Sequence, residues 1–181
     1  MRNMKAQDTA LALVDVQGKL ADLMFEKESL FDNIERMIRG AQALQIPILW
    51  AEQNPDKMGP TIQRIRDLLP GQSPISKMSF SCCGEPAFMD SLTAANRPHI
   101  LIAGIEAHVC VLQTATDLAS QGFAVDVVTD AVSSRTSSNR QLGIQCAQAR
   151  GAGLVSVEMA LFEMMRTAAH PAFREILKVV R

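Results

Sequence analysis

The chain contains no tyrosine and a single tryptophan among its 181 residues, while 48% of its residues are hydrophobic. An interior built from this composition has to be aliphatic and rich in methionine, because few aromatic rings are available to fill it. The length and hydrophobic content are sufficient for one core. We therefore expect a single domain over residues 1–181.

Several classes of protein are disfavoured because their sequence signatures are missing. The formal net charge is −1 and no basic stripe is present, which argues against nucleic acid and anionic membrane as partners. The longest apolar runs are far too short to span a bilayer. The first residues, MRNMKAQDTA, contain no apolar signal-peptide segment, so we expect a cytoplasmic protein.

Cysteine and histidine are both scarce, with four and three residues respectively. No Cys-x-x-Cys or His-x-x-x-His spacing is present, so no metal-ligand motif is visible. In a reducing cytoplasm we expect Cys82, Cys83, Cys110 and Cys146 to be free thiols. We interpret the adjacent Cys82 and Cys83 as small residues in a turn rather than as a redox pair, because disulfides are rare in cytosolic proteins.

Apolar runs alternate with helix-period segments along the chain, which is typical of a parallel sheet covered by helices on both faces. The predicted strands cover residues 9–16, 46–52, 75–80, 98–105, 123–130 and 154–157. The predicted helices cover residues 30–45, 61–69, 86–96, 109–122, 137–153, 158–168 and 171–180. We therefore expect a three-layer, doubly wound, Rossmann-like α/β fold with a six-stranded parallel sheet in the order 3-2-1-4-5-6.

Three reactive side chains stand at or near the ends of predicted strands. Asp15 ends the first strand after LALV, Lys77 lies in PISKMSF, and Cys110 follows the fourth strand in GIEAHVC. Ligands of doubly wound folds bind beyond the carboxyl ends of the strands, so this fold class brings such residues together. Taken singly, Asp15 can be a turn cap, Lys77 a solvated charge and Cys110 a small core residue.

Taken together, the three residues are the parts of an activated cysteine nucleophile. The start of a helix and a nearby cation both favour thiolate, so the sequence predicts a low pKa for the Cys110 thiol. Desolvation between apolar strands would raise the pKa of Asp15 towards a value that suits a general base. His108 is an unsuitable base, because residues two apart on a helix point to nearly opposite sides.

These segments resemble the isochorismatase-like cysteine hydrolase superfamily, and within it the isochorismatase-domain-containing proteins most of all. The resemblance extends over nearly the whole chain. It rests on LVDVQ, SKMSFS, GIEAHVCVLQTATDLASQG and the following VDVVTDAVSSR. The segments WAEQNPDKMGPT and HPAFREILKVV add to the similarity with the isochorismatase-domain-containing proteins.

The resemblance implies a metal-independent hydrolase that cleaves the C–N bond of an amide or carbamoyl group through a thioacyl intermediate on Cys110. It implies Asp15 as the base and Lys77 as the charge partner. It also implies a cis peptide bond between Ile105 and Glu106, with an oxyanion hole formed by the backbone N–H groups of Glu106 and Cys110. Members of this family are usually oligomeric, so we expect a homo-oligomer.

The segment after the second predicted strand lacks a metal-binding motif, which limits the kind of active site to expect. Nicotinamidases carry an Asp-x-His metal motif after that strand, whereas this chain reads WAEQNPDKMG, so the sequence predicts no metal and no other cofactor. An apolar wall with few polar anchors suits a small-molecule substrate. The residues expected to line the pocket are Gln17, Phe25, Trp50, Gln53 and Phe80.

Two alternatives stay open at the level of sequence. Residues 133–136, after the fifth strand, either contact substrate or only lead to a helix N-cap. The chain is either the hydrolase described above or a non-catalytic, redox-responsive binding protein that keeps the fold. The complete set of Asp15, Lys77 and Cys110 favours the hydrolase, since a binding protein needs none of them.

Overall fold

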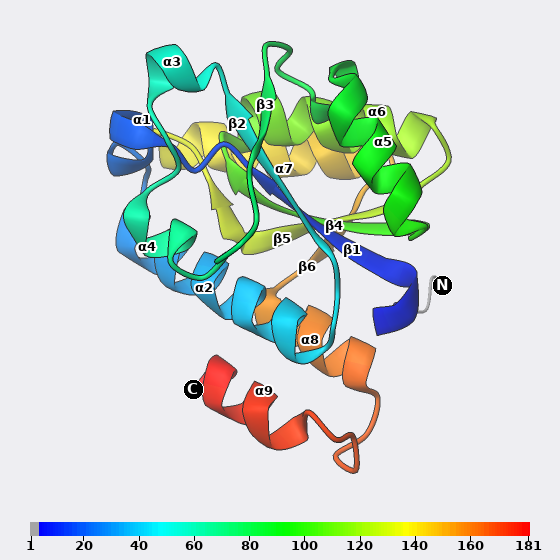
Figure 1. Ribbon diagram of the computed structural model, residues 1–181. Helices are drawn as coiled ribbons and strands as arrows, with labels where there is room; N and C mark the ends of the chain where they lie inside the picture. The colour runs from blue at the N-terminus through cyan, green and yellow to red at the C-terminus, as the bar shows by residue number, and fades with distance from the viewer. Residues whose placement is uncertain (1–3) are drawn as a thin grey trace.

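The computed structural model describes residues 4–181 and has three layers, with one sheet between two layers of helices (Figure 1). The strands are β1 (Thr9–Val14), β2 (Ile48–Gln53), β3 (Ile75–Lys77), β4 (His99–Ile105), β5 (Ala124–Ser133) and β6 (Gly153–Val155). All neighbouring strands are parallel, in the order β3-β2-β1-β4-β5-β6. The predicted fold class and strand order are confirmed.

The helices divide between the two faces of the sheet (Figure 1). They are α1 (Gly18–Asp22), α2 (Lys27–Ala43), α3 (Pro55–Met58), α4 (Gln63–Arg66), α5 (Pro86–Ala95), α6 (Leu112–Ser120), α7 (Ser137–Ala149), α8 (Val157–Met165) and α9 (Phe173–Val180). Single turns add η1 (Ala6–Asp8), η2 (Cys82–Gly84) and η3 (Ala107–Val111). Within residues 4–181, none of the helices has the length and apolar character needed to cross a bilayer.

The two faces of β1 explain the division of the core. Leu11 and Leu13 pack into a cluster with α2 and α8, whereas Ala12 and Val14 pack into a second cluster with α5, α6 and α7. Every residue of β1 and β4 is buried, which is why both strands read as continuous apolar runs. Burial of each large aliphatic side chain contributes about 1.5–3 kcal/mol to folding.

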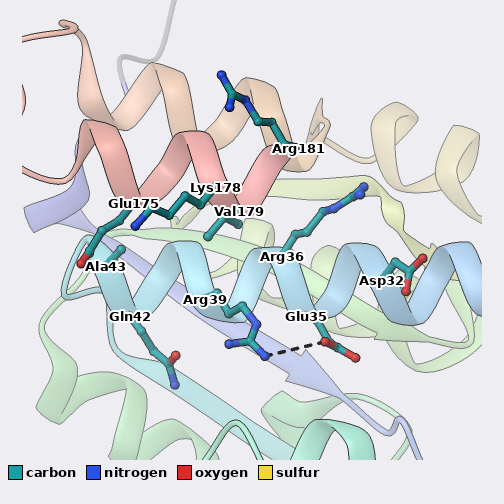
Figure 2. Close-up of a pocket in the computed structure, with 10 residues that line it drawn as sticks. All are labelled: Asp32, Glu35, Arg36, Arg39, Gln42, Ala43, Glu175, Lys178, Val179 and Arg181. Atoms are coloured by element: carbon teal, nitrogen blue, oxygen red, sulfur yellow. Dashed lines mark ion pairs between the residues drawn. The ribbon is translucent and has the colours of Figure 1, made fainter.

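The C-terminal helix α9 packs against α2 and α8, and its buried Ile176 belongs to the cluster on the α2 side of the sheet. A groove of about 890 Å³ runs between α2 and α9, and charged side chains from both helices line it (Figure 2). None of Asp15, Lys77 and Cys110 lines this groove, which lies on the α2 side of the sheet.

Several element ends differ from the prediction. The short polar helices α1 and α3 are not anticipated, because neither carries an apolar repeat. The strand expected over 75–80 ends at Lys77, and the residues after it form a turn. The helix expected over 137–153 ends at Ala149, and β5 continues to Ser133 past a register shift opposite Gly104.

Gly143 allows α7 to approach the turn η3. A Cβ atom at this position would lie 2.6 Å from the Ala107 carbonyl group and from the His108 nitrogen, so no side chain fits there. Because η3 also contains Cys110, this close packing of α7 helps to fix the backbone of the cysteine turn.

Replacing Gly143 with alanine is expected to destabilise the protein by about 1–3 kcal/mol, because the added methyl group meets backbone atoms. The sign is informative, since at an exposed helix position the same change stabilises by up to about 1 kcal/mol. Chemical denaturation would measure the change. Gln145→Ala, at an exposed position of α7, is the control and should stay within about 0.5 kcal/mol of wild type. A stabilising Gly143→Ala would contradict the close packing of α7 on η3.

Candidate active site

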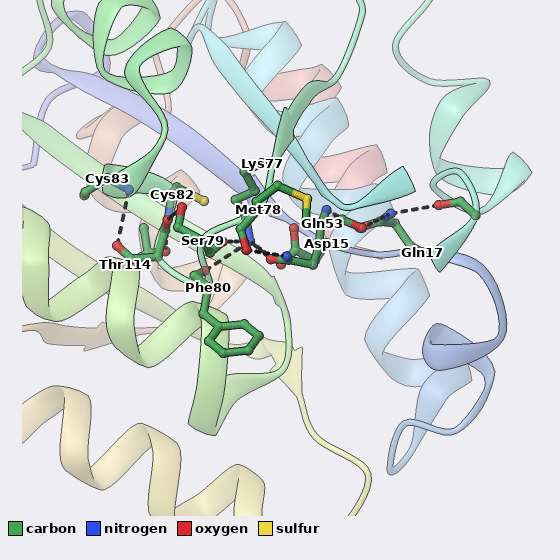
Figure 3. Close-up of polar contacts among 12 residues, drawn as sticks. Asp15, Gln17, Gln53, Lys77, Met78, Ser79, Phe80, Cys82, Cys83 and Thr114 are labelled. Carbon is green, nitrogen blue, oxygen red and sulfur yellow. Dashed lines mark hydrogen bonds and ion pairs between the residues drawn. The ribbon is translucent and has the colours of Figure 1, made fainter. Parts of the chain in front are cut away.

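Asp15 and Lys77 form a buried ion pair at the carboxyl edge of the sheet (Figure 3). The Lys77 Nζ atom lies 2.8 Å from Asp15 Oδ2, and the two side chains are 0% and 4% exposed. The same nitrogen donates to Gln53 Oε1 at 2.8 Å and to the carbonyl oxygens of Ser79 and Phe80 at 3.2 and 3.0 Å. Four oxygens therefore surround an ammonium group that has no contact with solvent.

The local backbone explains this geometry. Asp15 follows β1 directly and adopts a left-handed φ of 53°, a conformation in which aspartate is enriched among non-glycine residues. Lys77 ends β3, and the turn after it brings two carbonyl groups back to the ammonium. Gln17, which is buried, ties the neighbouring loops together, since its amide donates to the carbonyls of Gln53 and Gly59 at 3.1 and 2.7 Å.

Cys110 lies in η3, a π-helical turn between β4 and α6, and is 7% exposed. In an α-helix the Cys110 N–H would donate to the Glu106 carbonyl, four residues earlier. Here that carbonyl accepts from Val109 N at 3.0 Å and from Val111 N at 3.2 Å instead. The π turn therefore gives the Glu106 carbonyl to the amides on either side of Cys110, a type of irregularity that is frequent at functional sites.

Burial dominates the electrostatics of the cysteine. It raises the pKa of the Cys110 thiol above the ordinary value; the negative charge of Asp15 raises it further, while Lys77 lowers it. The sequence-based prediction of a low thiol pKa is therefore wrong. Its error lies in weighing the helix start and Lys77 above desolvation and the nearby carboxylate. Burial and the Asp15 carboxylate thus favour the protonated form of the thiol, next to the Asp15–Lys77 pair.

The pKa of Asp15 is also raised, as predicted, and burial is again the main cause. Lys77 and the nearby Cys110 thiol lower it and only partly offset this effect. The Asp15 Oδ1 atom is buried and has no hydrogen-bond partner within residues 4–181. One carboxylate oxygen is thus held by Lys77, and the other is free to accept a proton.

Trp50 does not lie beside Asp15, Lys77 and Cys110. Its side chain packs into the cluster on the α2 side of the sheet, whereas Cys110 belongs to the cluster on the opposite side, and its indole N–H donates to Thr61 Oγ1 at 2.8 Å. Its assignment to the pocket is therefore wrong. Successive strand residues point to opposite faces, and the flanking Leu49 and Ala51 are the ones that reach the cysteine side.

The other expected pocket residues lie nearer to the site, in different roles. Gln53 contacts Lys77 directly, and its amide also donates to the Met78 carbonyl at 2.8 Å. The Phe80 carbonyl accepts from Lys77, but the residue is 55% exposed and its ring projects away from the ion pair (Figure 3). Phe25 is half-buried, and its backbone N donates to the Ser134 carbonyl at 2.8 Å.

Sequence analysis missed two polar contacts that tie the cysteine segment to the end of β5. Glu106 Oε2 accepts from both the backbone N and the Nε atom of Arg135, each at 3.1 Å. His108 Nδ1 lies 2.9 Å from Ser134 Oγ. The structure contains the cis peptide bond between Ile105 and Glu106 that the family resemblance implied. The two side-chain contacts could not be predicted, because no sequence pattern indicates which of these residues pair.

The turn of residues 133–136 includes the helix cap that was one of the two alternatives. Thr136 Oγ1 accepts from Asn139 N at 3.2 Å and caps α7. Such a cap contributes about 1 kcal/mol to helix stability. Within the part of the chain that the structure describes, no three His, Cys, Asp or Glu side chains cluster in a way that could hold a metal ion.

Lys77→Met is expected to destabilise the protein by about 3–5 kcal/mol near neutral pH, because it leaves the Asp15 carboxylate buried without its cation. The loss should shrink as the pH falls. A carboxyl group whose pKa is raised by folding adds stability while it is protonated, and this stability is lost as the pH rises through the folded-state pKa.

Denaturation of wild type and variant at several pH values between about 4 and 8 would measure this dependence. The double variant Lys77→Met/Asp15→Asn has no buried charge and should recover most of the loss near neutral pH. A loss that is equal at all pH values would contradict the ion pair.

Comparison with known proteins agrees with this architecture. Residues 9–159 match the family model of the isochorismatase domain. The secreted isochorismatase effector Isc1 of Phytophthora sojae (strain P6497) is 35% identical over 178 residues, which cover 96% of this chain and 84% of that protein. Isochorismatase domain-containing protein 2A of Mus musculus is 34% identical over 176 residues, with coverage of 97% and 84%.

Similarity extends to solved structures. That of the MAR1 ribonuclease from Caenorhabditis elegans matches with a TM-score of 0.93 and 33% identity, and the match covers 99% of this chain and 92% of that one. The parallel sheet, its strand order and the extent of these matches point to one conclusion: this chain belongs to the isochorismatase-like hydrolase family.

Proposed function

We propose that this protein is a metal-independent cysteine hydrolase that cleaves the C–N bond of an amide or carbamoyl group in a small molecule. One observation carries the proposal. A buried carboxylate–ammonium pair and a helix-start thiol share one edge of the sheet, and the carboxylate influences the pKa of that thiol. Perturbed ionisable groups that cluster in this way are typical of catalytic sites.

In the first step the Cys110 sulfur attacks the carbonyl carbon, while its proton passes to Asp15. The raised pKa of the thiol means that thiolate is not stored in the resting site, so proton transfer accompanies the attack. Asp15 Oδ1 is the free acceptor, because Oδ2 is held by Lys77. The carbon–sulfur bond forms, and the carbonyl oxygen takes the negative charge.

The backbone N–H groups of Cys110 and Glu106 are proposed to receive that charge. The family resemblance suggests both donors. The hydrogen bonds of η3 support the first, because the Glu106 carbonyl is occupied by Val109 and Val111. Donors fixed in advance around a developing oxyanion contribute on the order of 3 kcal/mol each to lowering the barrier.

The intermediate then collapses. Asp15 returns its proton to the leaving nitrogen, the C–N bond breaks, and a thioester on Cys110 remains. A water molecule attacks the thioester, its proton passes to Asp15, and the carbon–sulfur bond breaks as the sulfur regains a proton. Lys77 holds the carboxylate in place through its contact with Asp15 Oδ2.

Small size of the substrate is part of the proposal, because Asp15, Lys77 and Cys110 are nearly enclosed. A homo-oligomer is proposed from the family resemblance, and light scattering would test it. The alternative, a redox-responsive binding protein, has no need of a free buried carboxylate oxygen beside the cysteine.

Asp15→Asn is expected to abolish acyl transfer and yet speed the alkylation of Cys110 by iodoacetamide near neutral pH. The variant removes the charge that raises the thiol pKa and leaves the Lys77 ammonium in place. Each unit by which the thiol pKa falls gives about ten times more thiolate. Mass spectrometry of the Cys110 peptide would measure the rate. Slower alkylation in this variant would contradict the proposed effect of Asp15 on the thiol.

The hydrolase activity is tested by turnover of a panel of small amides, carbamoyl compounds and nitriles. Cys110→Ala should lose turnover completely, whereas Cys146→Ala, on α7 and outside the site, should keep it. A quenched reaction should show the acyl group on Cys110 by mass spectrometry. Turnover that survives in Cys110→Ala, or turnover of RNA alone, would overturn the proposal.

A further inference from the structure

Glu106 carries a carboxylate that the proposed mechanism does not use. The side chain is 9% exposed, although the residue lies in the loop between β4 and η3, where a charged group would normally reach solvent. A carboxylate buried to this extent requires partners. Its backbone N–H is one of the two proposed oxyanion donors, so the residue lies next to the reacting atoms.

Arg135 is the partner of this carboxylate. Glu106 Oε2 accepts from the backbone N and from Nε of Arg135, both at 3.1 Å, so one residue supplies two donors to one oxygen. The Arg135 side chain is itself 55% exposed. Ion pairs with an exposed member contribute little to stability, so stability alone does not account for the pair.

The other end of Glu106 is held as well. Its carbonyl accepts from Val109 and Val111, which are parts of the cysteine turn. A residue that is fixed at both its carbonyl and its carboxylate has little freedom to rotate. Contacts from two separate elements, the η3 turn and the end of β5, therefore restrain the residue that carries this backbone N–H.

A second contact reinforces the link between these two elements. His108 Nδ1 and Ser134 Oγ lie 2.9 Å apart, one residue before Arg135 on the β5 side and two residues after Glu106 on the η3 side. Both contacts connect the same two segments, the η3 turn and the residues that follow β5. Of the two, only the Glu106–Arg135 contact involves a residue whose backbone N–H is a proposed oxyanion donor.

We propose that Glu106, held by Arg135, is a positioning residue that fixes the Glu106 backbone N–H in the oxyanion hole. This inference rests on the proposed hydrolase function. The carboxylate touches no reacting atom; it acts only through the backbone of its own residue. Misplacing a donor by about 1 Å can slow an enzymatic step by about a hundredfold, so loss of the contact should slow acylation while leaving the thiol unchanged.

Two probes that react with the same sulfur separate this role from a structural one. p-Nitrophenyl acetate acylates Cys110 by carbonyl attack, which creates an oxyanion before p-nitrophenolate leaves. Iodoacetamide alkylates the same sulfur by displacement of iodide, and no oxyanion forms at any stage. The ratio of the two rates therefore reports on the oxyanion hole and not on the thiol.

Glu106→Ala and Arg135→Ala are expected to slow acylation of Cys110 by p-nitrophenyl acetate by roughly 10–100-fold, with iodoacetamide alkylation within about twofold of wild type. Glu106→Gln keeps an acceptor oxygen for Arg135 and should retain most of the acylation rate. Arg140→Ala is the matched control, because Arg140 donates to the carbonyls of Val132 and Thr129 and does not contact Glu106.

Equal slowing of both reactions in Glu106→Ala and Arg135→Ala would show a general structural effect and overturn the positioning role. Unchanged acylation in both variants would overturn it as well. Arg135→Ala guards against misfolding of the Glu106 variant, since the Arg135 side chain is largely exposed. If wild type shows no Cys110-dependent acylation when compared with Cys110→Ala, the hydrolase proposal itself fails, a result distinct from an altered or unaltered rate ratio.

Discussion

The burial of the Lys77 ammonium imposes the strongest constraint on the carboxyl edge of the sheet. A charge that has lost all contact with water is tolerated only when acceptors surround it. Asp15, Gln53 and two backbone carbonyls meet this demand, and they come from the end of β1, the end of β2 and the turn after β3. β3 ends at Lys77, and the turn after it brings those carbonyls back to the ammonium.

Two ion pairs flank the cysteine turn, and they differ in burial. The Asp15–Lys77 pair is enclosed, so its charges act on the thiol: Asp15 adds to the effect of burial in raising the pKa of Cys110, and Lys77 opposes it. The Glu106–Arg135 pair has one exposed member, so water screens its effect on neighbouring charges and its importance is geometric. The buried Asp15–Lys77 pair thus affects the charge state of its neighbours, whereas the Glu106–Arg135 pair affects the orientation of the residue that carries the carboxylate.

The sequence was sufficient for features that depend on local pattern. Continuous apolar runs at β1 and β4 predicted the parallel sheet, and the ends of these strands located Asp15 and Cys110. It was insufficient for the direction in which a side chain points and for a pKa that depends on opposing effects. Alternation along β2 does not say which face Trp50 takes, and the spacing around Cys110 does not distinguish a π turn from an α-helix. The thiol pKa depends on how burial and two opposite charges compare, which only the folded structure determines.

If the thiol is neutral at rest, the net charge of the site decides whether ions must enter or leave it during turnover. The resting centre of the proposed mechanism combines one carboxylate, one ammonium and one uncharged sulfur, so its formal charge is zero. In the proposed cycle the thioester form has the same total, because the sulfur exchanges a proton for an acyl group. No counter-ion has to enter or leave this enclosed space when the covalent intermediate forms or breaks down. A narrow passage that admits water and uncharged molecules would then be enough to sustain turnover.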